Sequence, residues 1–206
     1  MKKWFLLIAV VLIVAIAGGI VARLQLTGAF SGISSVVEVG DSMPKFSLLD
    51  YKGNRHTLEQ YAGKIIVLDF CSHKCPFSRG IDLDLAALVR AYANNDQVVF
   101  LGIDSHCATT EQEIKEYVNI MDLPQPILRD PGNQYADAAG ALVTPDFFII
   151  DKEGKLVYRG AFDNRIIPDR PGDKTYVAYA IEALLTDIPV NPVHVPAWGC
   201  TIKRAS

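Results

Sequence analysis

The chain has 206 residues, of which 50% are hydrophobic and 21% charged, and its formal net charge is −3. This composition is typical of one compact domain that carries an additional apolar segment. Because the chain has no basic tract, nucleic acid is not an expected partner.

The additional apolar segment lies at the N-terminus. Lys2 and Lys3 precede the uncharged residues 4–22, a stretch of about 19 residues that is long enough to cross a hydrocarbon core of roughly 30 Å. A cleavable signal peptide has a shorter apolar region of about 7–15 residues, although 15-AIA-17 matches its cleavage motif. We therefore expect residues 1–25 to be a transmembrane anchor, with a cleaved signal as the alternative.

The two lysines orient this anchor. Positively charged flanks stay in the cytoplasm, so the remainder of a single-pass protein is expected on the extracytoplasmic, periplasmic side of the cell membrane. Disulfides form and persist in that compartment. Residues 26–40 are small and mostly uncharged and are expected to form a tether, followed by a folded domain at 41–190 and a C-terminal tail at 191–206.

Beyond the tether, the hydrophobic pattern alternates between the periods of strands and helices. It predicts, in order, a hairpin across 50-DYKGN-54, a buried strand at 65–70, a helix at 80–95, a buried strand at 98–104, a helix at 109–121, a hairpin across 152-KEG-154 and a helix at 174–187. Alternating strands and helices, followed by a hairpin and a helix, indicate an α/β fold with a central mixed sheet flanked by helices.

A cysteine pair follows the first buried strand directly. Cys71 and Cys75 are separated by three residues, and a proline follows the second cysteine. At the junction of a strand and a helix, the helix dipole and free backbone N–H groups stabilise a thiolate. Because Cys71 is nearer the strand, we expect it to attack a substrate disulfide and Cys75 to resolve the resulting mixed disulfide.

Three landmarks within residues 40–189 resemble the thioredoxin-like superfamily, in its membrane-tethered redoxin branch of TlpA-like and alkyl hydroperoxide reductase/thiol-specific antioxidant-like domains. They are the opening segment 41-DSMPKFSLLDYKG-53, the cysteine pair, and the hairpin 143-VTPDFFIIDKEGKLVYRG-160. The resemblance implies a thioredoxin-like fold and thiol–disulfide exchange with cysteine-containing client proteins and a redox partner protein. It also implies that Pro145, after Thr144, is cis and lies beside the active-site cysteines. We expect no cofactor for this chemistry.

Copper binding is a first alternative. The spacing C-x-x-x-C exceeds the thioredoxin spacing by one residue and resembles the copper site of Sco-type assembly proteins, in which two thiolates and a histidine suit Cu(I). The segment in which that family has its third ligand, here 143-VTPDFF-148, contains no histidine. His73 and His106 are the substitutes that would join Cys71 and Cys75.

Peroxide reduction is a second alternative. The segment 72-SHKCP-76 resembles the T-x-x-C-P signature of peroxiredoxins, with Ser72 in the threonine position and Cys75 as the nucleophile. The upstream proline of that signature would fall at Leu68 and is missing.

Two further cysteines bring the total to four, which allows three pairings. Cys107 follows the second central strand, at the sheet edge where α/β proteins build their sites. Cys200 lies on the tail, in 198-WGCTIKR-204, which resembles the GCxIK ending of redoxin-like proteins whose active site reads FTCNHCPY. We expect a Cys107–Cys200 disulfide that clamps the tail; two free thiols and a catalytic relay through Cys200 are the alternatives.

Overall fold

The computed structural model describes residues 36–204. The predicted anchor at 1–25 and most of the predicted tether lie outside the described residues. None of the helices between residues 36 and 204 has the length and apolarity that a bilayer crossing requires.

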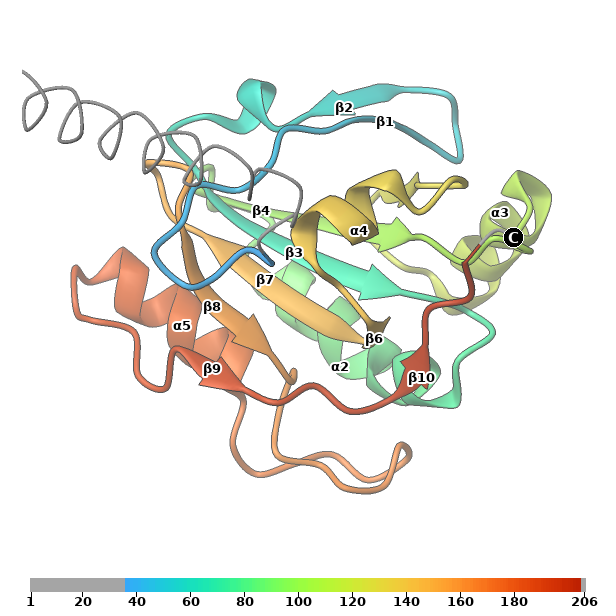
Figure 1. Ribbon diagram of the computed structural model, residues 1–206. Helices are drawn as coiled ribbons and strands as arrows, with labels where there is room; N and C mark the ends of the chain where they lie inside the picture. The colour runs from blue at the N-terminus through green and yellow to red at the C-terminus, as the bar shows by residue number, and fades with distance from the viewer. Residues whose placement is uncertain (1–35, 205–206) are drawn as a thin grey trace, which may run out of the picture. The chain divides into compact units, whose positions relative to one another are not determined.

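Eight strands form one mixed sheet in the order β2-β1-β5-β4-β3-β7-β8-β9 (Figure 1). They are β1 (Ser47–Asp50), β2 (Arg55–Thr57), β3 (Ile65–Cys71), β4 (Val98–Asp104), β5 (Ile127–Arg129), β7 (Asp146–Ile150), β8 (Leu156–Gly160) and β9 (His194–Val195). The central strands β3, β4 and β5 are parallel, and β7 runs antiparallel to β3. A separate antiparallel pair joins β6 (Val143–Thr144) to β10 (Cys200–Thr201) of the C-terminal tail.

Helices cover both faces of the sheet. They are α2 (Pro76–Ala91), α3 (Glu111–Met121), α4 (Gln134–Ala139) and α5 (Tyr176–Leu185), with a short 3-10 helix, η1 (Glu59–Tyr61). Successive side chains of a strand point to opposite faces. In β3, Ile66, Leu68 and Phe70 pack in the cluster that includes α4, whereas Ile65 and Val67 pack with α2 and α5. The central strand is therefore buried on both faces, as its unbroken apolar sequence predicts.

The predicted order of strands and helices is confirmed, with two kinds of difference. The helix predicted at 80–95 spans Pro76–Ala91, because proline pre-sets the backbone angle of a first helical residue and its missing N–H costs nothing there. The sequence pattern gave no signal for β5, α4 and the two-residue strands β6, β9 and β10. These elements have two to six residues and are too short to display a period.

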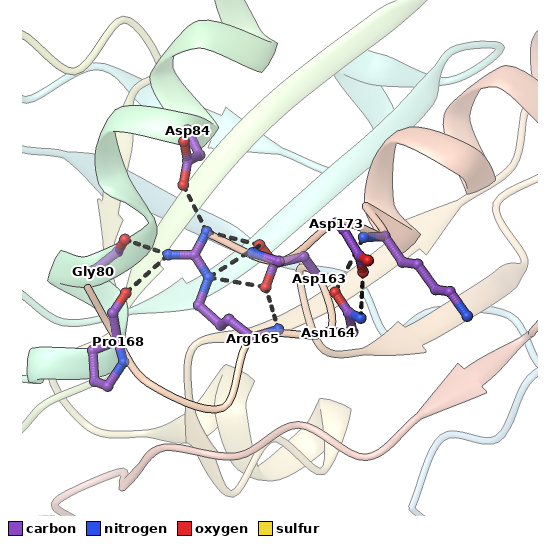
Figure 2. Close-up of polar contacts among 9 residues, drawn as sticks. Gly80, Asp84, Asp163, Asn164, Arg165, Pro168 and Asp173 are labelled. Atoms are coloured by element: carbon purple, nitrogen blue, oxygen red, sulfur yellow. Dashed lines mark hydrogen bonds and ion pairs between the residues drawn. The ribbon is translucent and has the colours of Figure 1, made fainter. Parts of the chain in front are cut away.

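The segment between β8 and α5 is fastened to α2 by Arg165 (Figure 2). Its guanidinium forms ion pairs with Asp163 at 2.7 Å and with Asp84 at 2.6 Å, and it donates hydrogen bonds to the carbonyl oxygens of Gly80 and Pro168. A Cβ at Gly80 would overlap the backbone of Pro168, so the close approach requires glycine. These contacts fix the segment against the first half of α2.

Candidate active site

Cys75 is the N-cap residue of α2, and Pro76 follows it as the first helical residue. The thiol is buried, and its Sγ donates a hydrogen bond to the carbonyl oxygen of Thr144 at 3.0 Å. The peptide bond between Thr144 and Pro145 is cis, as the resemblance to redoxins implies. The fold thus brings together three of the predicted site residues: Cys75, Thr144 and Pro145.

Cys200 of the tail lies in the same place. The pairing of β10 with β6 sets Cys200 directly opposite Thr144, and the Thr144 hydroxyl faces the Cys200 carbonyl oxygen at 3.5 Å. A groove of about 330 Å³ is lined by Cys75, Cys200, Thr144, His106 and two lysines. Two thiols that are far apart in the sequence therefore share one groove.

The two thiols of this groove differ in acidity. Burial opposes ionisation of Cys75, but hydrogen bonds from the side chains of Cys200 and Thr144 and from the backbone amides of Ser78 and Cys200 lower its pKa overall. Burial, the hydrogen bond to Cys75 and the Cys75 charge raise the pKa of Cys200 to about 11. Of the two thiols, Cys75 is therefore the one that ionises first, and on ionisation it loses the hydrogen bond that its Sγ donates to the Thr144 carbonyl oxygen.

The side chain of Cys71 does not line this groove. Cys71 is the last residue of β3, and alternation along this strand puts its side chain on the same face as Asp69, toward α2 and α3. It packs against the apolar cluster that includes Ile114 and Ile127. The residue is half-buried and lines a small cavity of about 20 Å³ to which Asp69, Asp82 and other side chains contribute.

The surroundings of Cys71 disfavour a thiolate. Burial and the charges of Asp69, Asp104 and Asp82 raise the pKa of Cys71 well above its usual value. The thiolate-stabilising environment that we expected at Cys71 is instead found at Cys75. The reason is that α2 begins at Pro76, so the helix N-terminus is directed at Cys75 and not at the strand end.

Buried carboxyl groups beside Cys71 have altered acidity as well. Burial and the charges of Asp82, Asp146 and Cys75 raise the pKa of Asp69 well above its usual value. Burial also raises the pKa of Asp82, which accepts a hydrogen bond from the Tyr117 hydroxyl, to about 6. Asp82 therefore changes protonation state closer to neutral pH than an ordinary aspartate does.

Cys107 is not bonded to Cys200. All four cysteines are free thiols, and Cys107 contacts the tail through its backbone amide, which donates to the Lys203 carbonyl oxygen at 2.9 Å. The Cys107 side chain is exposed, whereas Cys200 is paired with β6 beside Cys75. The predicted Cys107–Cys200 disulfide is thus not formed in this structure.

The residues of the copper alternative are divided between two places. His73 lies on the Cys71 side, where its Nδ1 is 3.9 Å from a carboxylate oxygen of Asp104, whereas His106 lines the groove of Cys75. Within residues 36–204, no three His, Cys, Asp or Glu side chains gather as ligands of a metal ion would. The donor set does not fit the predicted copper site.

The peroxidase signature is also incomplete in three dimensions. Leu68, where the signature has proline, lies inside β3 and is paired with Leu101 and Phe148. The Ser72 hydroxyl oxygen accepts a hydrogen bond from the Lys74 amide at 3.3 Å. The upstream loop of that signature is therefore replaced by a buried central strand.

Comparisons with known proteins agree with this fold. A solved structure of a hypothetical protein from Sinorhizobium meliloti 1021 superimposes with a TM-score of 0.77 and 31% sequence identity, covering 84% of this chain and 97% of that one. An uncharacterized conserved protein from Geobacillus kaustophilus gives a TM-score of 0.76 and 30% identity, covering 83% of this chain and 94% of that one.

A curated relative carries a functional name. The thiol-disulfide oxidoreductase ResA of Bacillus cereus is 27% identical over 158 residues, which cover 76% of this chain and 88% of the relative. The model of the AhpC/TSA family matches residues 39–159, which is more than half of the chain. The chain therefore belongs to the AhpC/TSA family, within the thioredoxin-like fold, and is homologous to thiol-disulfide oxidoreductases of the ResA type.

Proposed function

We propose that this protein is a thiol–disulfide oxidoreductase in which Cys75, the second cysteine of the C-x-x-x-C motif, is the attacking thiol. The observation that carries the proposal is the position of Cys75 at the start of α2, against the Thr144 carbonyl and the cis Pro145. The lowered pKa of Cys75 makes the thiolate more abundant near neutral pH, and the thiolate is the nucleophile in exchange. The name of the ResA relatives supports the same chemistry.

The reaction at Cys75 has two steps. The thiolate attacks one sulfur of a client disulfide, which forms a mixed disulfide and releases the other client sulfur as a thiolate that takes up a proton. A second thiol of the chain then attacks the Cys75 sulfur and releases the client. Cys71 is the second thiol that the C-x-x-x-C motif offers, and Cys200 is the second thiol that the groove offers.

The proposal includes a location and partners. Lys2, Lys3 and the apolar residues 4–22 support a single membrane anchor with the folded domain on the extracytoplasmic, periplasmic side. Client proteins with cysteines and a redox partner protein follow from the exchange reaction. Fusions of alkaline phosphatase and of green fluorescent protein to the C-terminus test the location. We expect an active phosphatase and a dark fluorescent protein, and the opposite pattern would place the domain in the cytoplasm.

The exchange reaction is tested on the full chain, purified in a mild detergent, with oxidised glutathione as the disulfide. We expect Cys75→Ser to abolish thiol–disulfide exchange and the exposed Cys107→Ser, the matched control, to keep the wild-type rate. Exchange that survives Cys75→Ser would contradict the proposal. If the wild-type protein consumes hydrogen peroxide through Cys75 and does not exchange with disulfides, the peroxidase alternative is the better description.

A further inference from the structure

We propose that Cys75 and Cys200 form the redox couple of this site, so that the tail cysteine resolves the mixed disulfide in place of Cys71. The inference rests on the proposed function, exchange at Cys75, and names the second thiol of that same site. It departs from the C-x-x-x-C motif, which pairs Cys75 with its near neighbour in the sequence.

The first argument is the contact between the two sulfur groups. Cys75 and Cys200 both line the groove of about 330 Å³, and they are near enough for each thiol to alter the pKa of the other. Thr144 connects them: its carbonyl oxygen accepts from the Cys75 Sγ at 3.0 Å, and it is the residue opposite Cys200 in the β6–β10 pairing. A sulfur at Cys200 can therefore reach the Cys75 sulfur without a rearrangement of the sheet.

The second argument is that the tail is fixed on both sides of Cys200. Before it, the Trp198 ring packs edge-on against Phe77 of α2, with ring centroids 4.7 Å apart. After it, the buried Ile202 joins the core, and its amide donates to the Leu142 carbonyl oxygen at 3.0 Å. The position of Cys200 is thus determined by packing and by backbone hydrogen bonds, and is not a chance approach of a loose end.

Gly199 makes this approach possible. A Cβ on Gly199 would overlap the carbonyl oxygen of Thr144 and would lie 3.3 Å from the Cδ of Pro145. Any larger residue would push the tail away from β6. Because Gly199 has no side chain, the tail backbone can pass directly over Thr144, whose carbonyl oxygen contacts Cys75.

The third argument is the separation of Cys71 from this groove. Cys71 lines the small cavity beside Asp69 and Asp82, whereas Cys75 lines the larger groove with Cys200. Strand alternation fixes the Cys71 side chain on the α2–α3 face. To bond with Cys75, Cys71 would have to leave this packed face, which Cys200 does not need to do.

The charge state of the site orders the two steps. While Cys75 is a thiolate, burial together with the hydrogen bond to Cys75 and the Cys75 charge raises the Cys200 pKa to about 11 and keeps Cys200 protonated. Once Cys75 is bound to a client sulfur, that charge is gone and the Cys200 pKa falls toward its ordinary value. Cys200 then loses its proton, bonds to the Cys75 sulfur and displaces the client thiolate. The client gains two electrons and two protons, and a dithiol reductant returns the Cys75–Cys200 disulfide to two thiols.

A peptide map of the oxidised protein tests the pairing directly. Trypsin cuts after Lys74, so the four cysteines fall on separate peptides: residues 65–74, 75–79, 91–115 and 175–203. The full chain is oxidised with oxidised glutathione, quenched in acid, alkylated and digested without reduction. We expect peptide 75–79 linked to peptide 175–203. A link between 65–74 and 75–79 as the main product would overturn the inference and leave exchange at Cys75 intact.

Single variants test the same step by its intermediate. With oxidised glutathione, Cys200→Ser should accumulate glutathione on peptide 75–79, and turnover should fall on the order of tenfold or more. Cys71→Ala, the matched control, should release glutathione as the wild type does, and thermal unfolding checks that each variant is folded. Accumulation in Cys71→Ala, and not in Cys200→Ser, would contradict the inference. The proposed function is tested separately by Cys75→Ser, which should form no glutathione adduct at this site whichever cysteine is the resolving thiol.

Discussion

Asp69 and Cys71 project from the same face of β3, two residues apart, into one small cavity. Burial of the thiol, together with the charge of Asp69, raises the Cys71 pKa. The Cys75 thiol, four residues later, lines instead the larger groove beside the C-terminal tail. The two cysteines of one short motif therefore occupy different electrostatic environments, and the predictions below depend on that difference.

The first prediction concerns the acidity of Cys75. Cys200→Ala removes the thiol whose hydrogen bond helps to lower the Cys75 pKa, so the pKa of Cys75 should rise. The rate of iodoacetamide alkylation of peptide 75–79, followed against pH, should show a midpoint shifted to higher pH and slower alkylation at pH 7. Cys107→Ala is the control and should leave the midpoint unchanged. A midpoint that stays in place in Cys200→Ala would show that the two thiols are not coupled.

The second prediction concerns the approach of the tail. Gly199→Val would place side-chain atoms against Thr144 and Pro145 and should displace β10. Formation of the Cys75–Cys200 disulfide should slow by roughly ten- to a hundredfold, because misplacement by about 1 Å has effects of that size on oriented reactions. Gly132→Ala is the control, since a Cβ there meets Gln134 at an ordinary 3.6 Å. Equal rates in the two variants would argue against the tail geometry.

The third prediction concerns stability against pH. Burial raises the pKa of Asp82 from 3.8 to about 6, so the folded state holds a proton that the unfolded state has already lost. This contribution to stability is complete below pH 3.8 and is lost as the pH rises through about 6. It amounts to at most about 3 kcal/mol at about 1.4 kcal/mol per pKa unit.

Asp82→Asn removes this titration and keeps the shape of the side chain. Urea unfolding between pH 4 and 7 should therefore show a smaller loss of unfolding free energy in the variant than in the wild type. Asp96, which is exposed, provides the control variant Asp96→Asn. A pH dependence that Asp82→Asn leaves unchanged would assign the effect to other groups, such as Asp69.

The fourth prediction concerns the Arg165 cluster of Figure 2. Arg165→Met would leave the Asp163 carboxylate, which is 2% exposed, without its main cation. Removal of one partner of a buried ion pair costs about 3–5 kcal/mol, so the free energy of unfolding should fall by about 3 kcal/mol. Arg170→Met, at an exposed position, should change it by about 0.5 kcal/mol or less. Similar effects in both variants would mean that the cluster does not hold the loop.

Long, strongly patterned segments made the general fold predictable. The central sheet was predicted from the continuous apolar runs at β3 and β4 and from the glycine-containing turns of both hairpins. Thr110 and Glu113 form the capping box that begins α3, which matches the helix start expected from the sequence. Even the orientation of Cys71 follows from counting along β3, since a residue two positions after Asp69 must share its face.

That Cys75 and Cys200 lie in one site could not be predicted from the sequence in the same way. The contact between Cys75 and Cys200 depends on β6 and β10, which have two residues each and no periodic signal. It also depends on α2 beginning at Pro76, four residues before the predicted start. A helix boundary and a tertiary strand pairing, rather than the cysteine spacing, decide which thiol meets Cys75.

The pairing of β6 with β10 has a consequence for how clients are bound. An extended peptide can add to an exposed sheet edge through backbone hydrogen bonds, and the residues before Pro145 would otherwise offer such an edge. Here the chain's own tail occupies it, from Cys200 to Thr201. A client disulfide must therefore reach Cys75 from the side of the groove that the tail does not cover, or it must displace β10, which carries Cys200. On the uncovered side, the client is selected by side-chain contacts and not by backbone hydrogen bonds.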